Sequence, residues 1–316
     1  EIFHLEKRQY MDLGTDFILL ESHDIDENKL ILAILRNWSI PIFEGKLEII
    51  IDNRLINKSN IEGYFRSKKE EIKKEITLPF IKFCIKAREG TDVVTYKLKR
   101  NLPNAKLDVR NLTKDLFQNE VSEKKMMDYI FQNKILEIEY QPKISYKEGS
   151  TFDDRFSVFI GKKSNEDDSK NSLGLVMRME QILWDEGTYS MQAAKTRDDL
   201  YILVASRSQR ISKLLTFFEV PSHRKFSQNY PDVNHFNFPF IKSNAFFNLT
   251  LFRRSANKAL YFLLDGEIKD DPTYLYSLFP DTYKSLDEPN EKRRKPKNIN
   301  DPQEGIDPAL PPEDLP

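Results

Sequence analysis

The chain has 316 residues, of which 39% are hydrophobic and 12% aromatic, so it can build sizeable cores and is not disordered as a whole. Its 49 Lys and Arg residues against 50 Asp and Glu residues give a net charge of -1, which excludes an overall attraction to nucleic acid or to anionic membranes. No run approaches the roughly 20 apolar residues that a membrane span needs, and no signal-peptide pattern is present. The single cysteine, Cys84, lies in an apolar segment and is expected to be a buried, inert thiol. We therefore expect a cytoplasmic protein without disulfides.

The N-terminal part reads as strand, helix and strand. Residues 17–20 are apolar and predict a short strand. Residues 28–43 follow a helical period, and either Asp26 or Asn28 is suited to cap that helix. Proline and glycine, at positions 41 and 45, are expected to end it.

Trp38 lies on the apolar stripe of this expected helix. The other members of the stripe are Leu30, Ile31, Ile34 and Leu35, at helical spacings from one another. The spacing predicts that Trp38 packs against a neighbouring sheet.

The rest of the chain mixes strand and helix patterns. Strands are expected at residues 47–51, 93–99, 136–140, 156–160, 175–179 and 201–205, and helices at residues 67–75, 122–134, 211–218 and 249–264. This mixture predicts an α+β fold with mixed or antiparallel sheets packed with helices.

Two segments indicate where the chain divides. Residues 164–172 are polar and predict an exposed loop, so that residues 26–165 form one α+β domain and residues 166–285 a second α+β region. Residues 286–316 are rich in proline and lack hydrophobic periodicity, which predicts a linker or a disordered C-terminal tail.

Most patterns that carry chemistry are absent from the sequence. It has no glycine-rich phosphate loop, no Cys/His metal spacing and no nucleophile elbow. Asp153, Asp154, Glu137 and Glu139 are nuclease candidates by residue type. The aspartates are expected to cap a turn, and the glutamates to face water on a strand.

The opening of the chain carries a resemblance to a known superfamily. Gly14 and Thr15 precede the strand at residues 17–20, and a helix follows. This order resembles the end of the ATP-binding domain of GHKL ATPases, the superfamily of gyrase, heat-shock chaperones, histidine kinases and MutL, where a connecting helix leads to a transducer domain. The resemblance implies that Gly14 and Thr15 bind the cofactor ATP, with Thr15 at the adenine end.

Three further segments, residues 37–49, 173–179 and 214–223, look like bacterial GHKL-type proteins, several of them associated with phage defence. Arg178 matches an arginine of that group, and Glu219, Pro221 and His223 match a Glu-x-Pro-x-His-like segment. Glu219 and His223 could form an acid/base pair, but a structural role is expected for them.

The resemblance implies a function for the chain as a piece of a longer protein, in keeping with its start at Glu1 rather than at a methionine. Residues 1–25 would be the last strand of an upstream ATP-binding domain, followed by a transducer-like region. The motifs that hold magnesium-ATP do not occur here, so the chain is expected not to be catalytic alone. It would couple the nucleotide state of the parent protein, which would bind ATP and magnesium and could form a homodimer, to an effector or partner protein.

Two alternatives stay open. The first is a nucleic-acid-binding or nucleic-acid-processing protein that uses Arg253, Arg254 and Lys258 together with the basic residues 292–297. The second is a plain protein-interaction module.

Overall fold

The computed structural model describes residues 26–268 except for 52–53, 74–75, 101–111, 170–172, 180, 184–198, 220–225 and 227–237. The expected strand at residues 17–20 and the expected tail at residues 286–316 lie outside this part of the chain. No described helix has both the length and the apolar composition that crossing a membrane requires.

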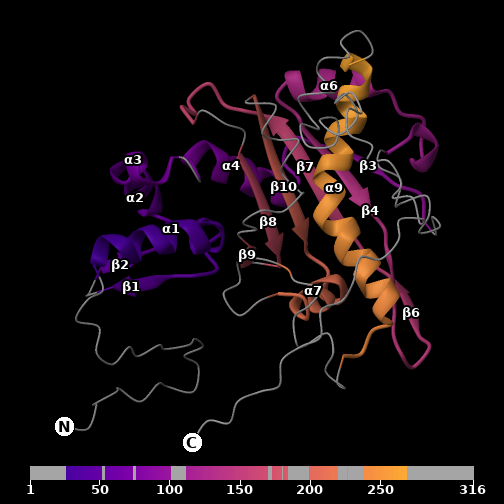
Figure 1. The fold of residues 1–316 in the computed structure, drawn as a ribbon. Helices are drawn as coiled ribbons and strands as arrows, with labels where there is room; N and C mark the ends of the chain where they lie inside the picture. The colour runs from indigo at the N-terminus through magenta and orange to yellow at the C-terminus, as the bar shows by residue number, and fades with distance from the viewer. Residues whose placement is uncertain are drawn as a thin grey trace, which may run out of the picture.

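The fold is α+β, as the sequence predicts (Figure 1). The helices are α1 (Glu27–Phe43), α2 (Ile61–Ser67), α3 (Lys69–Ile72), α4 (Leu78–Glu89), η1 (Lys114–Leu116), α6 (Glu123–Phe131), α7 (Gln209–Thr216) and α9 (Lys242–Ile268). The strands are β1 (Ile49–Ile51), β2 (Arg54–Ile56), β3 (Val93–Lys97), β4 (Ile135–Tyr140), β5 (Lys143–Ser145), β6 (Thr151–Asp153), β7 (Phe156–Lys162), β8 (Leu173–Arg178), β9 (Gln181–Leu183) and β10 (Leu200–Ser206).

A mixed six-stranded sheet organises the molecule, in the order β3-β4-β7-β10-β8-β9. The pairs β3/β4 and β8/β10 are parallel, and the other neighbours are antiparallel. Strands before and after residue 165, where the sequence predicts a division of the chain into two regions, belong to this one sheet. The central strands β7 and β10 are buried almost throughout, because helices cover both faces of the sheet.

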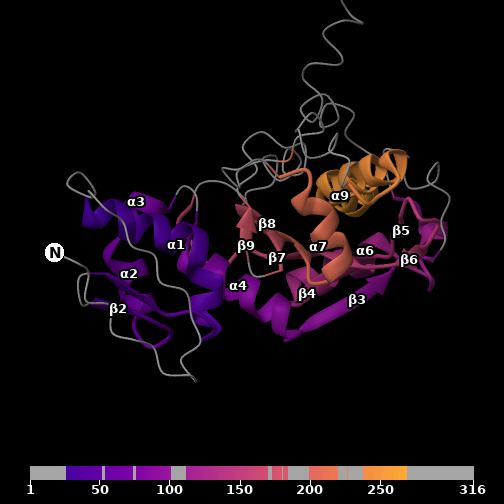
Figure 2. The same cartoon turned by 90° about the horizontal axis from the view of Figure 1, so that it is seen from below.

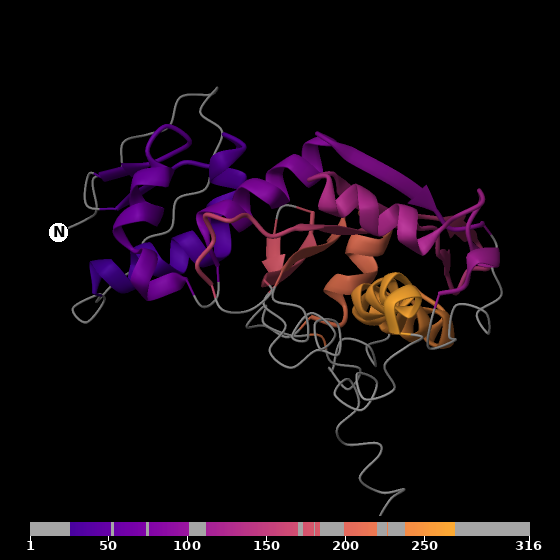
Figure 3. The ribbon, with the colours of Figure 1, turned by 90° about the horizontal axis from the view of Figure 1, so that it is seen from above.

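Two hydrophobic cores lie on opposite faces of the sheet. Alternate residues of β10 separate them: Ile202 and Val204 join one core, while Leu203 and Ala205 join the other. Helices α6, α7 and α9 cover the first face, and α1 and α4 the second. Figures 2 and 3 show the unit of α1, α2, α3 and the β1/β2 hairpin beside the sheet, with α9 against the strands.

Helix α1 begins where its cap predicts. Asp26 is the N-cap, and its Oδ1 accepts a hydrogen bond from the Asn28 backbone N–H at 2.9 Å. The helix ends at Phe43, which is the end that the sequence predicts, although Pro41 lies inside its last turn rather than after it. Gly45, at φ 75°, takes the left-handed conformation that turns the chain toward β1.

The expected packing of Trp38 is wrong, because 43% of this side chain is exposed. Ile34 and Leu35 are buried as predicted, but in the last turns the buried positions move to Ser39 and Ile40. Near its C-terminus, α1 therefore packs against its neighbours through Ser39 and Ile40, and Trp38 lies beside this buried face.

The charged segments also differ from expectation. The helix predicted at residues 67–75 is only α3, a single turn. The loop predicted to be exposed at residues 164–172 contains Asp167, which is only 9% exposed. Lys258 on α9 is 5% exposed and therefore cannot join a basic outer face with Arg254. Cys84 is fully buried, as predicted, and burial raises the pKa of its thiol.

Candidate functional site

The two residues expected to contact ATP, Gly14 and Thr15, lie outside the described residues. So do Pro221, His223 and the basic residues 292–297. The structure therefore bears on function through the elements that follow the expected nucleotide pocket.

Arg178 and Glu219, two residues that carry the resemblance, meet in the structure. Arg178 Nη2 lies 2.8 Å from Glu219 Oε2, and the glutamate side chain is only 3% exposed. Arg178 also donates to Thr216 Oγ1 at 2.9 Å and to Gln181 Oε1 at 2.6 Å. The arginine thus ties the end of β8 to β9 and to the end of α7, which is the structural role that the sequence predicts for Glu219.

A second arginine, Arg88, joins three separate parts of the chain. Its Nε donates to Glu44 Oε1 at 2.7 Å and its Nη2 to Glu44 Oε2 at 3.3 Å. Its Nη1 donates to the backbone oxygen of Met179 at 2.8 Å. The guanidinium therefore links the C-terminal end of α1, through Glu44, to the turn between β8 and β9. We call Arg88, Glu44 and Met179 the Arg88 junction.

Local structure explains the position of each member. Arg88 lies in the last turn of α4 on the same buried face as Ile81 and Cys84, and Gly90 ends that helix in the left-handed conformation. Glu44 is the C-cap of α1. Met179 has a φ of 55°, an uncommon value for a residue other than glycine, and its N–H donates to Ser206 O at 2.7 Å.

The carboxylate of the junction is held in its charged form. Burial alone would raise the pKa of Glu44, but hydrogen bonds and positive charge from Lys46 and Arg88 outweigh burial and lower it. Lys46 Nζ lies 2.8 Å from Glu44 Oε2 at the exposed side. Because the Arg88 and Glu44 side chains are only 6% and 9% exposed, this ion pair is shielded from solvent.

An open cavity of about 340 Å³ adjoins the junction. Arg207 also lines it, and its Nη2 donates to the backbone oxygen of Ala87 at 3.3 Å. The cations in its described lining are salt-bridged or donate to backbone oxygens. This arrangement can hold elements in register.

The nuclease candidates share a different cavity, of about 290 Å³, lined by Glu139, Asp153 and Asp154. Glu139 is 6% exposed, so the expectation that it faces water is wrong; neighbouring strands β3 and β7 enclose it. Glu137 instead accepts hydrogen bonds from Thr95 and Ser157. Asp154 caps the start of α7, accepting from the Ile211 N–H at 2.7 Å.

Within the described part of the chain, no three His, Cys, Asp or Glu residues are grouped so that they could hold a metal ion. The carboxylates around this cavity are thus used to fix strands and a helix start.

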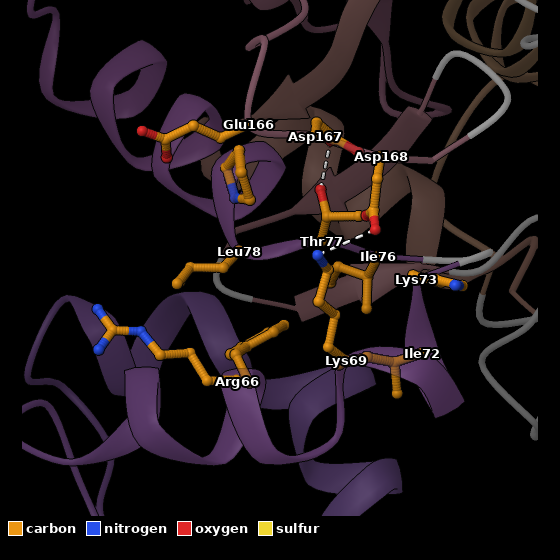
Figure 4. Close-up of a pocket in the computed structure, with 12 residues that line it drawn as sticks. Arg66, Lys69, Ile72, Lys73, Ile76, Thr77, Leu78, Glu166, Asp167 and Asp168 are labelled. Atoms are coloured by element: carbon orange, nitrogen blue, oxygen red, sulfur yellow. Dashed lines mark hydrogen bonds and ion pairs between the residues drawn. The ribbon is translucent and has the colours of Figure 1, made fainter.

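A third polar cluster surrounds Asp167 (Figure 4). Asp167 Oδ2 accepts from Thr77 Oγ1 at 2.5 Å and from the Tyr201 hydroxyl, and Oδ1 accepts from the Ser169 N–H at 2.9 Å. Burial opposes the charged form, but these hydrogen bonds lower the pKa of Asp167. Figure 4 shows Thr77 and Asp167 pointing toward each other beside a cavity of about 170 Å³. The cluster anchors the loop after β7 to the start of α4.

Comparisons with family models, with curated proteins and with solved structures find no match to this chain.

Proposed function

We propose that this chain is the coupling region of a bacterial GHKL-type ATPase of the group associated with phage defence. It transmits a nucleotide-dependent change from an upstream ATP-binding domain to an effector or partner protein, and it is not catalytic alone. ATP and magnesium belong to the parent protein, with Gly14 and Thr15 at the end of the nucleotide pocket.

The Arg88 junction is the observation that carries this proposal. In the proposed arrangement α1 leaves the nucleotide pocket, and its C-terminal end is fixed by Arg88 to the turn between two strands of the main sheet. A helix of 17 residues is about 25 Å long and stiff. Movement at its start would therefore reach the sheet through the Arg88 junction and through the hydrophobic core that α1 shares with β9, rather than be absorbed in a loop.

Contacts near the start of α1 support the proposal that this helix moves together with the β1/β2 hairpin and α2. Glu27 pairs with Arg54 of β2 at 2.6 Å, and Asn28 accepts from Lys68 at 2.8 Å. These contacts hold the helix to the hairpin and to the end of α2.

The test compares ATP hydrolysis by this chain with hydrolysis by the longer natural protein that contains it. We expect magnesium-dependent turnover by the longer protein only, and an Asn-bearing helix and an Asp-x-Gly turn in the sequence before Glu1. Magnesium-dependent hydrolysis by the purified chain alone, or a longer protein without those motifs, would overturn the proposal.

A further inference from the structure

Five lysines surround one cavity at the end of the main sheet where β7 ends and β4 begins. The cavity has a volume of about 580 Å³. Its lysines come from three places in the chain: Lys82 and Lys86 from α4, Lys134 from the residue before β4, and Lys162 and Lys163 from the end of β7. The fold therefore brings together charges that the sequence keeps up to 81 positions apart, from Lys82 to Lys163.

The walls between the lysines are well defined. Phe83, Gly161 and Tyr201 all line the cavity, and Gly161 pairs with Tyr201 across the β7/β10 ladder. A Cβ atom at Gly161 would come within 2.6 Å of the Phe83 ring, so the glycine lets α4 lie close to the strand. Asn133, at φ 61°, makes the tight turn that brings Lys134 to the rim.

The lining is far more basic than the chain as a whole. One carboxylate, Glu166, faces five lysines, whereas the whole chain carries almost equal numbers of acids and bases. Three of the lysines have partners: Lys82 pairs with Glu62 at 2.9 Å, Lys134 pairs with Asp92 at 2.7 Å, and Lys163 donates to the Ser169 backbone oxygen.

Lys86 and Lys162 differ from these three. Both are exposed, and among the described residues no carboxylate oxygen lies within 4.0 Å of either ammonium group. The positive charge also affects Asp92, which lies nearby. A hydrogen bond with Lys134 lowers the pKa of Asp92, and the charge of Lys86 lowers this pKa more weakly. Two lysines without an ion pair among the described residues thus line a cavity whose other three lysines are already held in place.

We propose that this cavity binds phosphate groups, supplied either by a free polyphosphate or by the backbone of a nucleic acid. Lysine ammonium groups bind phosphate as point charges, and several of them around one space suit a ligand with more than one negative charge. The volume falls in the range of about 300–1,000 Å³ typical of ligand sites. Ser164, Asn165 and Asn133 add hydrogen-bonding groups to the lining. This inference does not depend on the proposed coupling function.

The test measures binding of two probes, inorganic tripolyphosphate and a single-stranded oligothymidylate, to this chain by titration calorimetry. The test variant carries Lys86→Gln and Lys162→Gln, and a matched control carries Lys124→Gln and Lys213→Gln, which remove two exposed lysines elsewhere. All four substitutions are at exposed positions, and circular dichroism checks that both variants keep the wild-type fold. We expect the test variant to bind about tenfold more weakly than the wild type, and the control variant to bind as the wild type does.

The two probes distinguish the sources of phosphate. Binding of tripolyphosphate with no tighter binding of the oligonucleotide supports a free polyphosphate. Tighter, strongly salt-dependent binding of the oligonucleotide supports a nucleic-acid backbone. No binding of either probe to the wild type, or an equal loss in the test and control variants, would overturn the proposal.

Discussion

Arg88 and Glu44, which are 44 positions apart in the chain, form a shielded ion pair in which the same guanidinium also holds the backbone oxygen of Met179. One side chain thus connects the end of α1, the end of α4 and the turn between β8 and β9. Loss of this side chain would leave the backbone oxygen of Met179 without its donor, and would leave the buried Glu44 carboxylate with Lys46 as its remaining cation. The junction is therefore expected to matter for stability as well as for the proposed coupling.

Replacing Arg88 by alanine is expected to destabilise the protein by about 3–5 kcal/mol, the range for breaking a buried ion pair from one side. Urea denaturation followed by circular dichroism measures the change. Lys82→Ala is the control, because it removes an exposed ion pair with Glu62 and should cost less than about 1 kcal/mol. Equal losses from the two substitutions would show that the Arg88 contact is no stronger than a surface pair.

The charged state of Glu44 predicts how stability changes with pH. Its pKa is lower in the folded protein than the 4.5 of an unperturbed glutamate. Its contribution to stability is therefore present above pH 4.5 and is lost as the pH falls through the folded-state pKa. Between about pH 5 and pH 3, the urea midpoint of the wild type should fall more steeply than that of Glu44→Gln. Parallel curves for the two proteins would mean that Glu44 titrates normally.

Trp38 and Leu35 lie three positions apart on α1 but differ in exposure, at 43% and 0%. Leu35→Ala is expected to cost about 2–5 kcal/mol because it leaves a cavity in the core. Trp38→Ala should cost much less, about 1 kcal/mol or below, since the ring is largely in water. Thermal melting of both variants checks the order, and a larger loss for Trp38→Ala would place the indole inside a core.

Gly161 and Phe83 make the close contact between β7 and α4. Gly161→Ala should cost about 1–3 kcal/mol, because the new methyl group meets the Phe83 ring at 2.6 Å. Phe83→Leu in the same chain should relieve part of that loss, since the smaller side chain leaves room for it. A double-mutant cycle by urea denaturation measures the coupling. Additive losses would show that the ring moves aside freely.

The sequence predicts much of the secondary structure, because local patterns determine it. The strands β4, β7, β8 and β10 and the helix α6 lie close to their expected places, and Asp26, one of the two caps that the sequence offers for α1, is the cap in the structure. The order of the sheet is not predictable in this way, since every pair except β8/β9 joins strands distant in the chain. The parallel contact of β3 with β4 and that of β8 with β10 depend on tertiary packing.

The candidate site is less predictable from the sequence than the secondary structure is. Arg88 lies four positions after Cys84 and seven after Ile81, so it falls on the apolar face of α4. A charged residue on such a face is the one feature of the sequence that indicates a buried ion pair here. Nothing local marks Glu44 or the Met179 backbone as its partners. The sequence predicts an exposed acidic loop around Asp167, because Thr77 and Tyr201 reach this residue only in the folded chain.

Hydrogen exchange in the proposed parent protein, with and without ATP and magnesium, tests the proposed coupling most directly. The wild type should show nucleotide-dependent changes in amide protection at the end of α1 and in the turn after β8. In Arg88→Ala the change at α1 should persist and the change at the turn should be lost, while Lys124→Ala, a substitution at an exposed position of α6, should behave as the wild type. An unchanged response of the turn in a folded Arg88→Ala protein would contradict the proposal that the Arg88 junction transmits the movement.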